Sequence, residues 1–268
     1  MTATPSVRPL IIGHRGSSAI APENTLAAFR QVKEDGADGF EFDVRLARDG
    51  KPVVIHDGNL KRTARDPRNV SELTSTELRQ IEVGSWFNQR HPDKASDEYA
   101  QETVPTLEQV FDLTSGTDQL LYLEMKCERN QATQLAAAVV RLIKQYSIID
   151  QVVIASFDLP AIAEVKRLES AIRTAALFQP RLERPASLLK KVKTVDLAVD
   201  ARADELALHH SLAAKRVVDK ATRAGLPVVV WTVDNPNWIK RALSTGIAAL
   251  ITNNPALLLK ERSRLGAV

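Results

Sequence analysis

The chain has 268 residues, of which 44% are hydrophobic and 26% are charged, and it carries a formal net charge of +3 with a single cysteine, Cys127. This length suits one large α/β domain or two small ones. The scattered charges do not form the basic stripe of a nucleic-acid-binding protein. One cysteine excludes an internal disulfide and favours a reducing compartment, and no apolar run reaches the length of a membrane span. We therefore expect a cytoplasmic protein with no nucleic-acid partner and no stable membrane insertion.

Short apolar runs alternate with amphipathic stretches along the whole chain. Helical patterns lie between most of these runs. One of them, NTLAAFRQVKEDG, follows the first apolar run, and we expect Asn24 to cap this helix. Alternating strands and helices indicate a parallel sheet covered by helices. We predict a closed (β/α)₈ TIM barrel as a single catalytic domain over residues 1–268; a doubly wound sheet is the alternative, but GHRGSSAIAPEN poorly matches its phosphate turn. The expected strands cover residues 10–13, 40–44, 120–125, 152–156, 174–178, 195–199, 228–233 and 248–252.

Residues 58–104 interrupt this alternation with a polar segment that is too long for a simple loop. We predict a small inserted subdomain that follows the hairpin of the second strand and covers the mouth of the barrel. SELTSTEL within it is expected to begin a short helix. Trp86 and Phe87 are the aromatic residues expected to roof the site, and a hydrophobic mini-core inside the insertion is the alternative for them.

The stretch EFDVRLARDGKPVVIHD, residues 41–57, contains a strong hairpin signal at Asp49-Gly50. A two-residue turn at this point would pair Asp43 with His56, whereas a three-residue turn would shift the pairing by one. Glu41 and Asp43 are two positions apart and therefore share one face of a strand. The hairpin is thus expected to return His56 to the level of the two acids.

A third acid, Glu124, lies at the end of another apolar run, LLYLEM. Because the carboxyl ends of barrel strands converge on one face, we expect Glu41, Asp43 and Glu124 to meet there. Three unpaired carboxylates would repel one another strongly. One divalent cation would offset this repulsion, and a set of oxygen ligands suits Mg²⁺ or Ca²⁺.

Basic side chains follow the same strand ends. His14 and Arg15 close LIIGHRG, and Lys126 follows Glu124 by two positions. The histidines His14 and His56 offer an acid and a base near neutral pH. Arg15 and Lys126 supply positive charge that suits a phosphate.

Several of these residues also have ordinary interpretations. His14 taken alone is more typical of a satisfied core histidine, and Trp231 in VVVWTVDN is expected to be half core and half site wall. We interpret His209-His210 in ALHHSL as surface or capping residues at a helix start, with metal binding as a minority alternative.

Nine motifs follow one another along the chain in this order: GHRG, PENT, EFDV, DG, VVIHD, PTLEQV, LEMK, VWTVDN and ITNNP. Through these motifs the chain resembles the glycerophosphodiester phosphodiesterase family from about residue 9 to residue 258. The resemblance implies a TIM barrel with a small inserted subdomain. It also implies a phosphoric diester hydrolase that converts glycerophosphodiesters into glycerol 3-phosphate and an alcohol with a divalent cation. Carried over residue by residue, it implies metal ligands at Glu41, Asp43 and Glu124, an acid/base pair at His14 and His56, and phosphate contacts at Arg15 and Lys126.

The chain departs from the family pattern near its C-terminus. Similar sequences often read GVDGIITD there, and this chain reads GIAALITNN, with Ala248, Ala249 and Asn253 at the altered positions. None of these is a proposed catalytic group, so the departure bears on substrate detail more than on the reaction.

We expect the cation to bind a non-bridging phosphate oxygen while one histidine activates water or the neighbouring glycerol hydroxyl and the other protonates the leaving alcohol. A lipase D-type phosphodiesterase acting on lysophospholipids or sphingolipids is the first alternative. It would need an apolar groove at the barrel mouth, and the polar insertion argues mildly against this. A non-enzymatic barrel that binds phosphate compounds is the second, but pure binding does not require two histidines.

Overall fold

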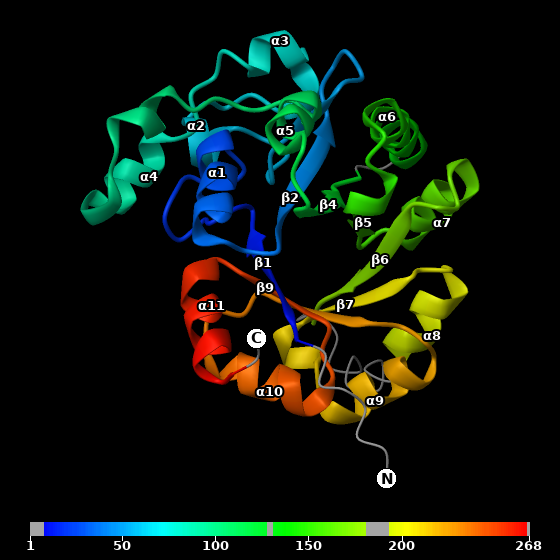
Figure 1. Cartoon of the computed structure of the whole chain (residues 1–268). Coiled ribbons are helices and arrows are strands. Elements are labelled where there is room, and N and C mark those ends of the chain that lie inside the picture. The colour runs from blue at the N-terminus through cyan, green and yellow to red at the C-terminus, as the bar shows by residue number, and fades with distance from the viewer. Residues whose placement is uncertain (1–7, 128–130, 181–192, 267–268) are drawn as a thin grey trace.

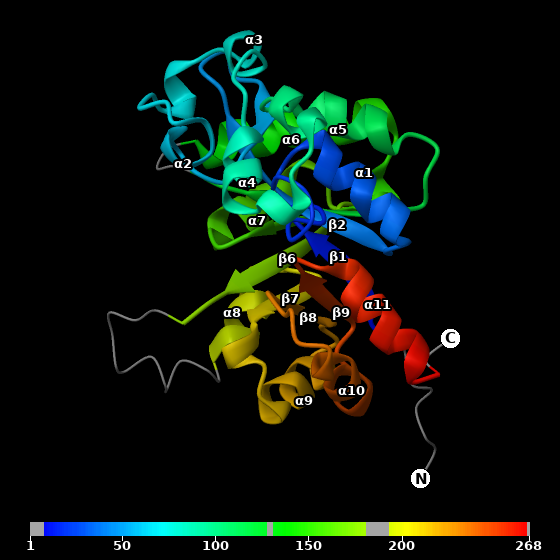
Figure 2. The ribbon, with the colours of Figure 1, turned by 90° about the vertical axis from the view of Figure 1, so that its left-hand side faces the viewer.

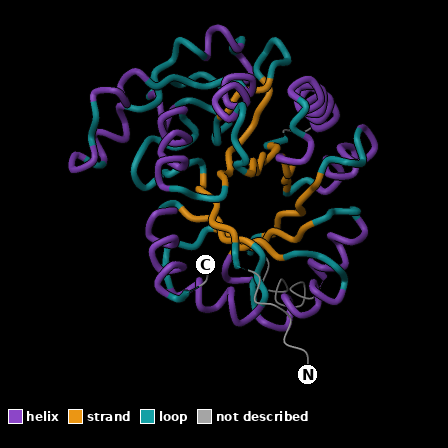
Figure 3. The backbone as a smooth tube through the Cα atoms, in the orientation of Figure 1, coloured by secondary structure: helices purple, strands orange, loops and turns teal. Residues whose placement is uncertain are grey.

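The computed structural model describes residues 8–127, 131–180 and 193–266. Parallel strands close into a barrel in the order β1-β9-β8-β7-β6-β5-β4-β2, with β1 pairing with β2 and with β3 added antiparallel to β2. Figure 3 shows the ring of strands surrounded by helices, so the predicted TIM barrel is confirmed. The strands are β1 (Leu10–His14), β2 (Gly39–Leu46), β3 (Pro52–Val54), β4 (Leu120–Met125), β5 (Val152–Ser156), β6 (Arg173–Phe178), β7 (Glu205–His209), β8 (Val228–Trp231) and β9 (Ala249–Thr252).

Helices follow the strands and cover the outside of the barrel (Figure 1). Each buries an apolar stripe; α6, for example, buries Leu135, Val139 and Leu142 at helical spacing. The barrel helices are α1 (Leu26–Asp35), α5 (Leu107–Thr114), α6 (Ala132–Tyr146), α7 (Leu159–Leu168), α8 (Lys193–Asp200), α9 (Lys215–Arg223), α10 (Asn237–Thr245) and α11 (Pro255–Arg264).

One expected strand is wrong. Residues 195–199 lie in α8, where Val195 and Ala198 are buried and Leu197 and Val199 are exposed, which is a helical pattern rather than an alternating one. The strand at this point of the barrel is β7, with the sequence ELALH. His209-His210 therefore lies at a strand end and not at the start of an α-helix.

The hairpin exists, but its predicted register is shifted by one. Val44 faces Val54 and Leu46 faces Pro52, so a three-residue turn replaces the two-residue type I′ turn. The turn ends at Gly50, whose φ of 74° lies in the left-handed region that suits glycine in this kind of hairpin. His56 nevertheless returns beside the acids, because Ile55 N–H donates to the carbonyl of Asp43 at 2.9 Å.

The inserted segment contains short helices around a small apolar core that it shares with Ala47, Val53 and Ile55 of the hairpin. The α-helices are α2 (Lys61–Ala64), α3 (Ser75–Leu78) and α4 (Ser85–Arg90), joined by 3₁₀ helices at Val70–Glu72, Pro92–Lys94 and Asp97–Gln101. SELTSTEL does begin a helix, since Thr74 and Glu77 form a capping box at α3. Figure 2 shows α4 of this segment on the same side of the molecule as α1. Lys94 and Tyr99 donate to the carbonyls of Ala19 and Ile20 in the loop after β1.

The strands alternate inward and outward side chains, and this alternation sets what reaches the barrel mouth. The barrel interior is filled by residues such as Ile12, Ala207, Val229 and Ile251. The next positions on the same faces are His14 on β1, His209 on β7 and Trp231 on β8. Polar and aromatic groups at these positions therefore face the carboxyl end of the barrel.

Helices long and apolar enough to cross a membrane are absent from the part of the chain that the structure describes.

Candidate active site

Three carboxylates gather at the carboxyl end of β2 and β4. Glu41 and Asp43 lie on β2, and the register places Asp43 opposite Glu124 on β4. All three side chains are buried, and one oxygen of each lies within 4.8 Å of the others. The structure thus brings together the acids that the sequence predicts.

Two basic side chains, Lys126 and Arg15, neutralise part of this negative charge. Lys126 Nζ lies 2.6 Å from Glu124 Oε1 and 3.1 Å from Asp43 Oδ1, while Arg15 Nε lies 3.2 Å from Asp43 Oδ2. The backbone N–H of Arg15 also donates to Glu41 at 2.9 Å. Arg15 has a φ of 54° and Gly16 a φ of 84°, so the chain turns sharply after β1 and aims this N–H at the acid.

Asn24 has a different role from the helix cap that the sequence predicts. Thr25 caps α1, and Asn24 is buried against Asp43 instead. Its Nδ2 donates to Asp43 Oδ2 at 2.8 Å, and its Oδ1 accepts from the backbone N–H of Asp43 at 3.2 Å. This reciprocal pair orients Asp43, and the two residues are 19 positions apart, which is why local capping rules miss it.

Burial and mutual repulsion raise the pKa values of Glu41 and Glu124, whereas the neighbouring basic side chains lower that of Asp43. Burial, with the charges of Asp43 and Glu124, raises the pKa of Glu41, and burial beside Asp43 raises the pKa of Glu124 to about 7. Burial also acts to raise the pKa of Asp43, but Lys126 and Arg15 hold it well below its usual range. The two basic side chains, Lys126 and Arg15, therefore do not keep all three carboxyl groups of the cluster ionised.

The donor set fits a hard divalent cation. Asp43 Oδ1 and Glu124 Oε1 are buried and receive no hydrogen bond of normal geometry from the described residues; the ammonium of Lys126 lies beside both at ion-pair distance. Three converging carboxylates, two of which present such an oxygen, match the all-oxygen ligand sets that Mg²⁺ and Ca²⁺ prefer. The residues are therefore compatible with a metal site.

His14 lies next to the acids, and its ring is bound by Asn253 on the side away from them. Its Nδ1 lies 2.7 Å from Asn253 Oδ1, and its Nε2 lies 4.0 Å from Glu41 Oε2. Burial, followed by the charge of Arg15, lowers the pKa of His14 to about 4. The imidazole is therefore neutral at physiological pH, with Nε2 directed toward the acids.

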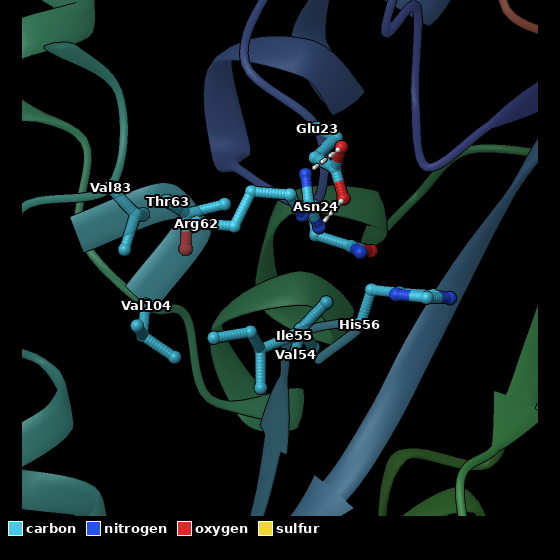
Figure 4. A pocket seen from close by; sticks show the side chains of 9 residues that line it. All are labelled: Glu23, Asn24, Val54, Ile55, His56, Arg62, Thr63, Val83 and Val104. Atoms are coloured by element: carbon cyan, nitrogen blue, oxygen red, sulfur yellow. Dashed lines mark hydrogen bonds and ion pairs between the residues drawn. The ribbon is translucent and has the colours of Figure 1, made fainter. Parts of the chain in front are cut away.

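His56 contacts the carboxylate of Asp57, which in turn binds Arg62 of the insertion. His56 Nδ1 lies 2.7 Å from Asp57 Oδ1, and Arg62 Nε of α2 donates to Asp57 Oδ2 at 2.7 Å. Arg62 also binds both oxygens of Glu23 at 2.8 Å, beside a small pocket that His56 and Asn24 help to line (Figure 4). Burial lowers the pKa of His56, and Arg15 and Lys126 contribute to this shift.

Aromatic rings lie next to the acid cluster, since Lys126 Nζ is 5.9 Å from the centre of the Phe157 ring. The ring of Trp231 meets Phe157 at 5.6 Å and His209 at 5.4 Å, both edge to face. The Trp231 indole N–H is buried and has no acceptor among the described residues. His209 accepts from the backbone N–H of Ser211, so the expected capping role is present in a 3₁₀ turn. A metal-binding group around it is not found among the residues described.

Trp86 lies in an aromatic cluster of the insertion. Its ring meets Phe87 at 5.9 Å, its indole N–H donates to the carbonyl of Val83 at 2.8 Å, and the guanidinium of Arg62 lies 5.8 Å from its centre. Trp86 thus packs within the insertion and also against Arg62, the residue that connects the insertion to His56.

The altered positions near the C-terminus have different consequences. Ala248 directly precedes β9, and Ala249 begins it, faces Leu10 and packs in the barrel interior, away from the carboxyl face. Asn253 follows β9 and contacts His14 directly. Of the three departures, only Asn253 reaches the site.

Acidic, histidine and basic side chains thus meet at the carboxyl face of a (β/α)₈ barrel, the end where TIM-barrel enzymes place their active sites. A model of the glycerophosphoryl diester phosphodiesterase family matches residues 14–257. The glycerophosphodiester phosphodiesterase of Caldanaerobacter subterraneus subsp. tengcongensis is 30% identical over 253 residues, which cover 94% of this chain and 97% of that protein. That of Bacillus subtilis is 31% identical and covers 95% of this chain and 87% of that protein.

Solved structures agree with these similarities. A phosphodiesterase of Oleispira antarctica, in complex with the product sn-glycerol-3-phosphate, matches with a TM-score of 0.82 and 28% identity over 95% of this chain and 97% of that chain. The glycerophosphodiester phosphodiesterase of Thermotoga maritima matches with a TM-score of 0.72 and 28% identity over 94% and 97% of the two chains. The chain belongs to the glycerophosphoryl diester phosphodiesterase family and is a phosphoric diester hydrolase.

Proposed function

We propose that this protein hydrolyses glycerophosphodiesters to glycerol 3-phosphate and an alcohol, with Glu41, Asp43 and Glu124 holding one divalent cation, Mg²⁺ or Ca²⁺. The observation that carries the proposal is the arrangement of the two histidines. Each is bound at Nδ1 by a partner, which leaves Nε2 for proton transfer; His14 Nε2 lies 4.0 Å from Glu41, and His56 is close enough to Asp43 to feel its charge. When bound, the cation would offset the negative charge of the phosphate.

The chain's own residues perform the remaining steps. Arg15 and Lys126, already at the acid cluster, attract and orient the phosphate. One histidine takes a proton from the nucleophile, which is water or the glycerol hydroxyl next to the phosphate, and the other gives a proton to the departing alcohol oxygen. Asn24 keeps Asp43 in place throughout, because the two share reciprocal hydrogen bonds.

The two tryptophans are proposed to contact the organic parts of the substrate. The indole N–H of Trp231, which has no acceptor among the described residues, is proposed to donate to a substrate hydroxyl. The insertion of residues 58–104 is proposed to cover the mouth with Trp86. We expect Trp231→Ala and Trp86→Ala each to raise KM, or to change the preference among alcohol groups, with little loss of stability. Phe87→Leu is the matched control, because Phe87 is fully buried and should affect stability alone. A large drop in melting temperature with unchanged kinetics in Trp86→Ala would assign Trp86 to the core of the insertion.

A substrate panel tests the proposed reaction. Purified protein is assayed against glycerophosphodiesters and lysophospholipids with Mg²⁺, with Ca²⁺ and with chelator. We expect glycerol 3-phosphate from the water-soluble diesters in the presence of a cation. Preferential release of the headgroup alcohol from lysolipids would instead support the lipase D-type alternative, and no turnover of any diester would support a binding protein.

A further inference from the structure

Asn253 connects His14 to Asp234, an acid in the loop that follows the neighbouring strand β8. Its Oδ1 lies 2.7 Å from His14 Nδ1 and accepts from Ser18 Oγ at 2.9 Å, while its Nδ2 donates to Asp234 Oδ2 at 2.7 Å. The other oxygen of Asp234 accepts from the backbone N–H of Asn253 at 2.8 Å and from the hydroxyl of Thr252 at 3.0 Å. The side chain of Asn253 is thus fixed from two directions.

The orientation of the amide follows from the chemistry of its partners. A carboxylate only accepts hydrogen bonds, so the NH₂ group of Asn253 must face Asp234 and the amide oxygen must face His14. The opposite orientation would bring the amide oxygen against the carboxylate and lose the bond entirely. Asp234 therefore determines which atom His14 meets.

The orientation of the amide in turn fixes the proton of the imidazole. Because Asn253 Oδ1 can only accept, His14 Nδ1 must carry the hydrogen. In the neutral ring the lone pair then lies on Nε2, the nitrogen that is 4.0 Å from Glu41. The lone pair faces the acid cluster and not the wall of the barrel.

We propose that Asp234 and Asn253 form a positioning pair that fixes both the ring orientation and the tautomer of His14, so that Nε2 is presented as a proton acceptor. The catalytic meaning of this pair rests on the proposed function of His14. The carboxylate that similar sequences lead one to expect at position 253 is here supplied by Asp234, one hydrogen bond further from the imidazole. Neither residue needs to touch the substrate for this role.

Exchange of the two side chains gives a direct test. Asn253→Asp places two carboxylates against each other, and Asp234→Asn no longer dictates the orientation of the amide. Each should lower kcat roughly 10- to 100-fold with little change in KM, as for other partners that orient a functional histidine. In the double variant Asp234→Asn/Asn253→Asp, the new amide donates to the new carboxylate, which accepts from His14 Nδ1. We expect the double variant to recover most of the lost kcat, a strongly non-additive result.

A spectroscopic readout tests the hydrogen bonds without relying on turnover. The ¹⁵N shifts of the His14 ring should show neutral imidazole protonated at Nδ1 in the wild-type protein and a mixture of tautomers in Asn253→Leu. Asn254→Ala is the matched control, since Asn254 caps α11 at the neighbouring position and should affect stability alone. Its His14 shifts and its kcat should match the wild type.

Two results would overturn the proposal: neutral His14 protonated at Nε2 in the wild type, or a double variant no better than the worse single variant. Full turnover in His14→Ala would instead overturn the proposed function, and the nitrogen shifts would still report on the hydrogen bonds by themselves.

Discussion

The two histidines differ in the partners that hold them. His14 donates to a neutral amide, whereas His56 pairs with the carboxylate of Asp57. Both are bound at Nδ1 and both have lowered pKa values, chiefly because burial penalises the charged imidazolium. A partner that can only accept fixes the tautomer in each case, so the two rings are pre-organised in the same way by different groups.

Removing either imidazole should remove a proton-transfer step. We expect His14→Ala and His56→Ala each to lower kcat roughly 100-fold or more. The pH–rate profile should be bell-shaped, and its acid limb should lie below pH 6.5, because a base with a lowered pKa stays neutral, and therefore active, to lower pH. Steady-state rates across pH measure both effects. His210→Ala is the control, because His210 is an exposed histidine outside the acid cluster. Near-wild-type turnover in His14→Ala or in His56→Ala would refute the assignment of these two residues.

Arg62 contacts the site in a way that the sequence patterns do not indicate. It holds Asp57, which holds His56, and it binds Glu23, which also pairs with Arg15 at 2.7 Å. Arg62→Gln should therefore lower kcat roughly 10-fold or more while KM changes little, since Asp57 loses the group that orients it. Arg68→Gln is the control, because Arg68 pairs with Asp66 elsewhere in the insertion. Equal kinetics in the two variants would mean that Arg62 does not position His56.

At the scale of elements, the sequence predicts best where the apolar pattern is strong. The segment FEFDV and the run LLYLEM are rich in aromatic and apolar residues and are found as β2 and β4. The strand β7, with the sequence ELALH, lacks β-branched residues, and VDLAV next to it resembled a strand better although it forms part of α8. Short apolar runs of this kind are ambiguous because packing, not local preference, decides them.

The site is predictable where its residues follow strand ends and is not where partners are distant in sequence. Glu41, Asp43 and Glu124 could be placed together because parallel strands end on one face. The bond between His14 and Asn253 joins residues 239 positions apart, and no local pattern records it. The hairpin register differs by one residue from the two-residue pairing that Asp49-Gly50 predicts, because the turn has three residues.

The hairpin gives a prediction at this scale. Gly50 has a φ of 74°, which a β-branched residue tolerates poorly, and Gly50→Val should cost roughly 1–3 kcal/mol of stability. The strained turn should let the returning arm shift, so kcat should fall toward that of His56→Ala. Combining the two changes should add little, because both remove the same group.

Gly116→Val controls for strain alone. Gly116 has a φ of 73° and an added Cβ there would meet nothing within 4 Å, but it lies between α5 and β4, away from His56. It should lower the melting temperature with kcat unchanged. A fully active Gly50→Val, or a double change with His56→Ala that multiplies the losses, would show that the turn does not set the position of His56.

At the scale of the whole molecule, closing the barrel has an electrostatic cost. Closure brings Glu41, Asp43 and Glu124 into one buried cluster, and the pKa values of Glu41 and Glu124 are raised as a result. A carboxyl group with a raised pKa in the folded state stabilises the fold fully below its unfolded pKa, and this contribution is lost as the pH rises through the folded value. For Glu124 the loss extends up to about pH 7.

A divalent cation should offset this loss, because it binds the ionised carboxylates and the folded state alone assembles them. At a concentration about 100 times its Kd, a cation contributes about 2.7 kcal/mol of stability, which corresponds to several degrees in melting temperature. We expect the increase in melting temperature on adding Mg²⁺ or Ca²⁺ to be larger at pH 8 than at pH 5, and turnover to stop after exhaustive EDTA treatment.

The buried carboxyl group at the other end of the barrel provides the matched control for this measurement. Glu205 at the start of β7 also has a raised pKa, mainly through burial, and it accepts from the Tyr122 hydroxyl at 2.7 Å. Glu205→Gln should change the melting temperature itself but leave the increment from the cation, and its pH dependence, as in the wild type. Glu124→Gln should reduce both. An increment that is the same at both pH values, or that survives in Glu124→Gln, would place the cation somewhere other than the three acids, and full activity after EDTA treatment would remove the metal from the reaction altogether.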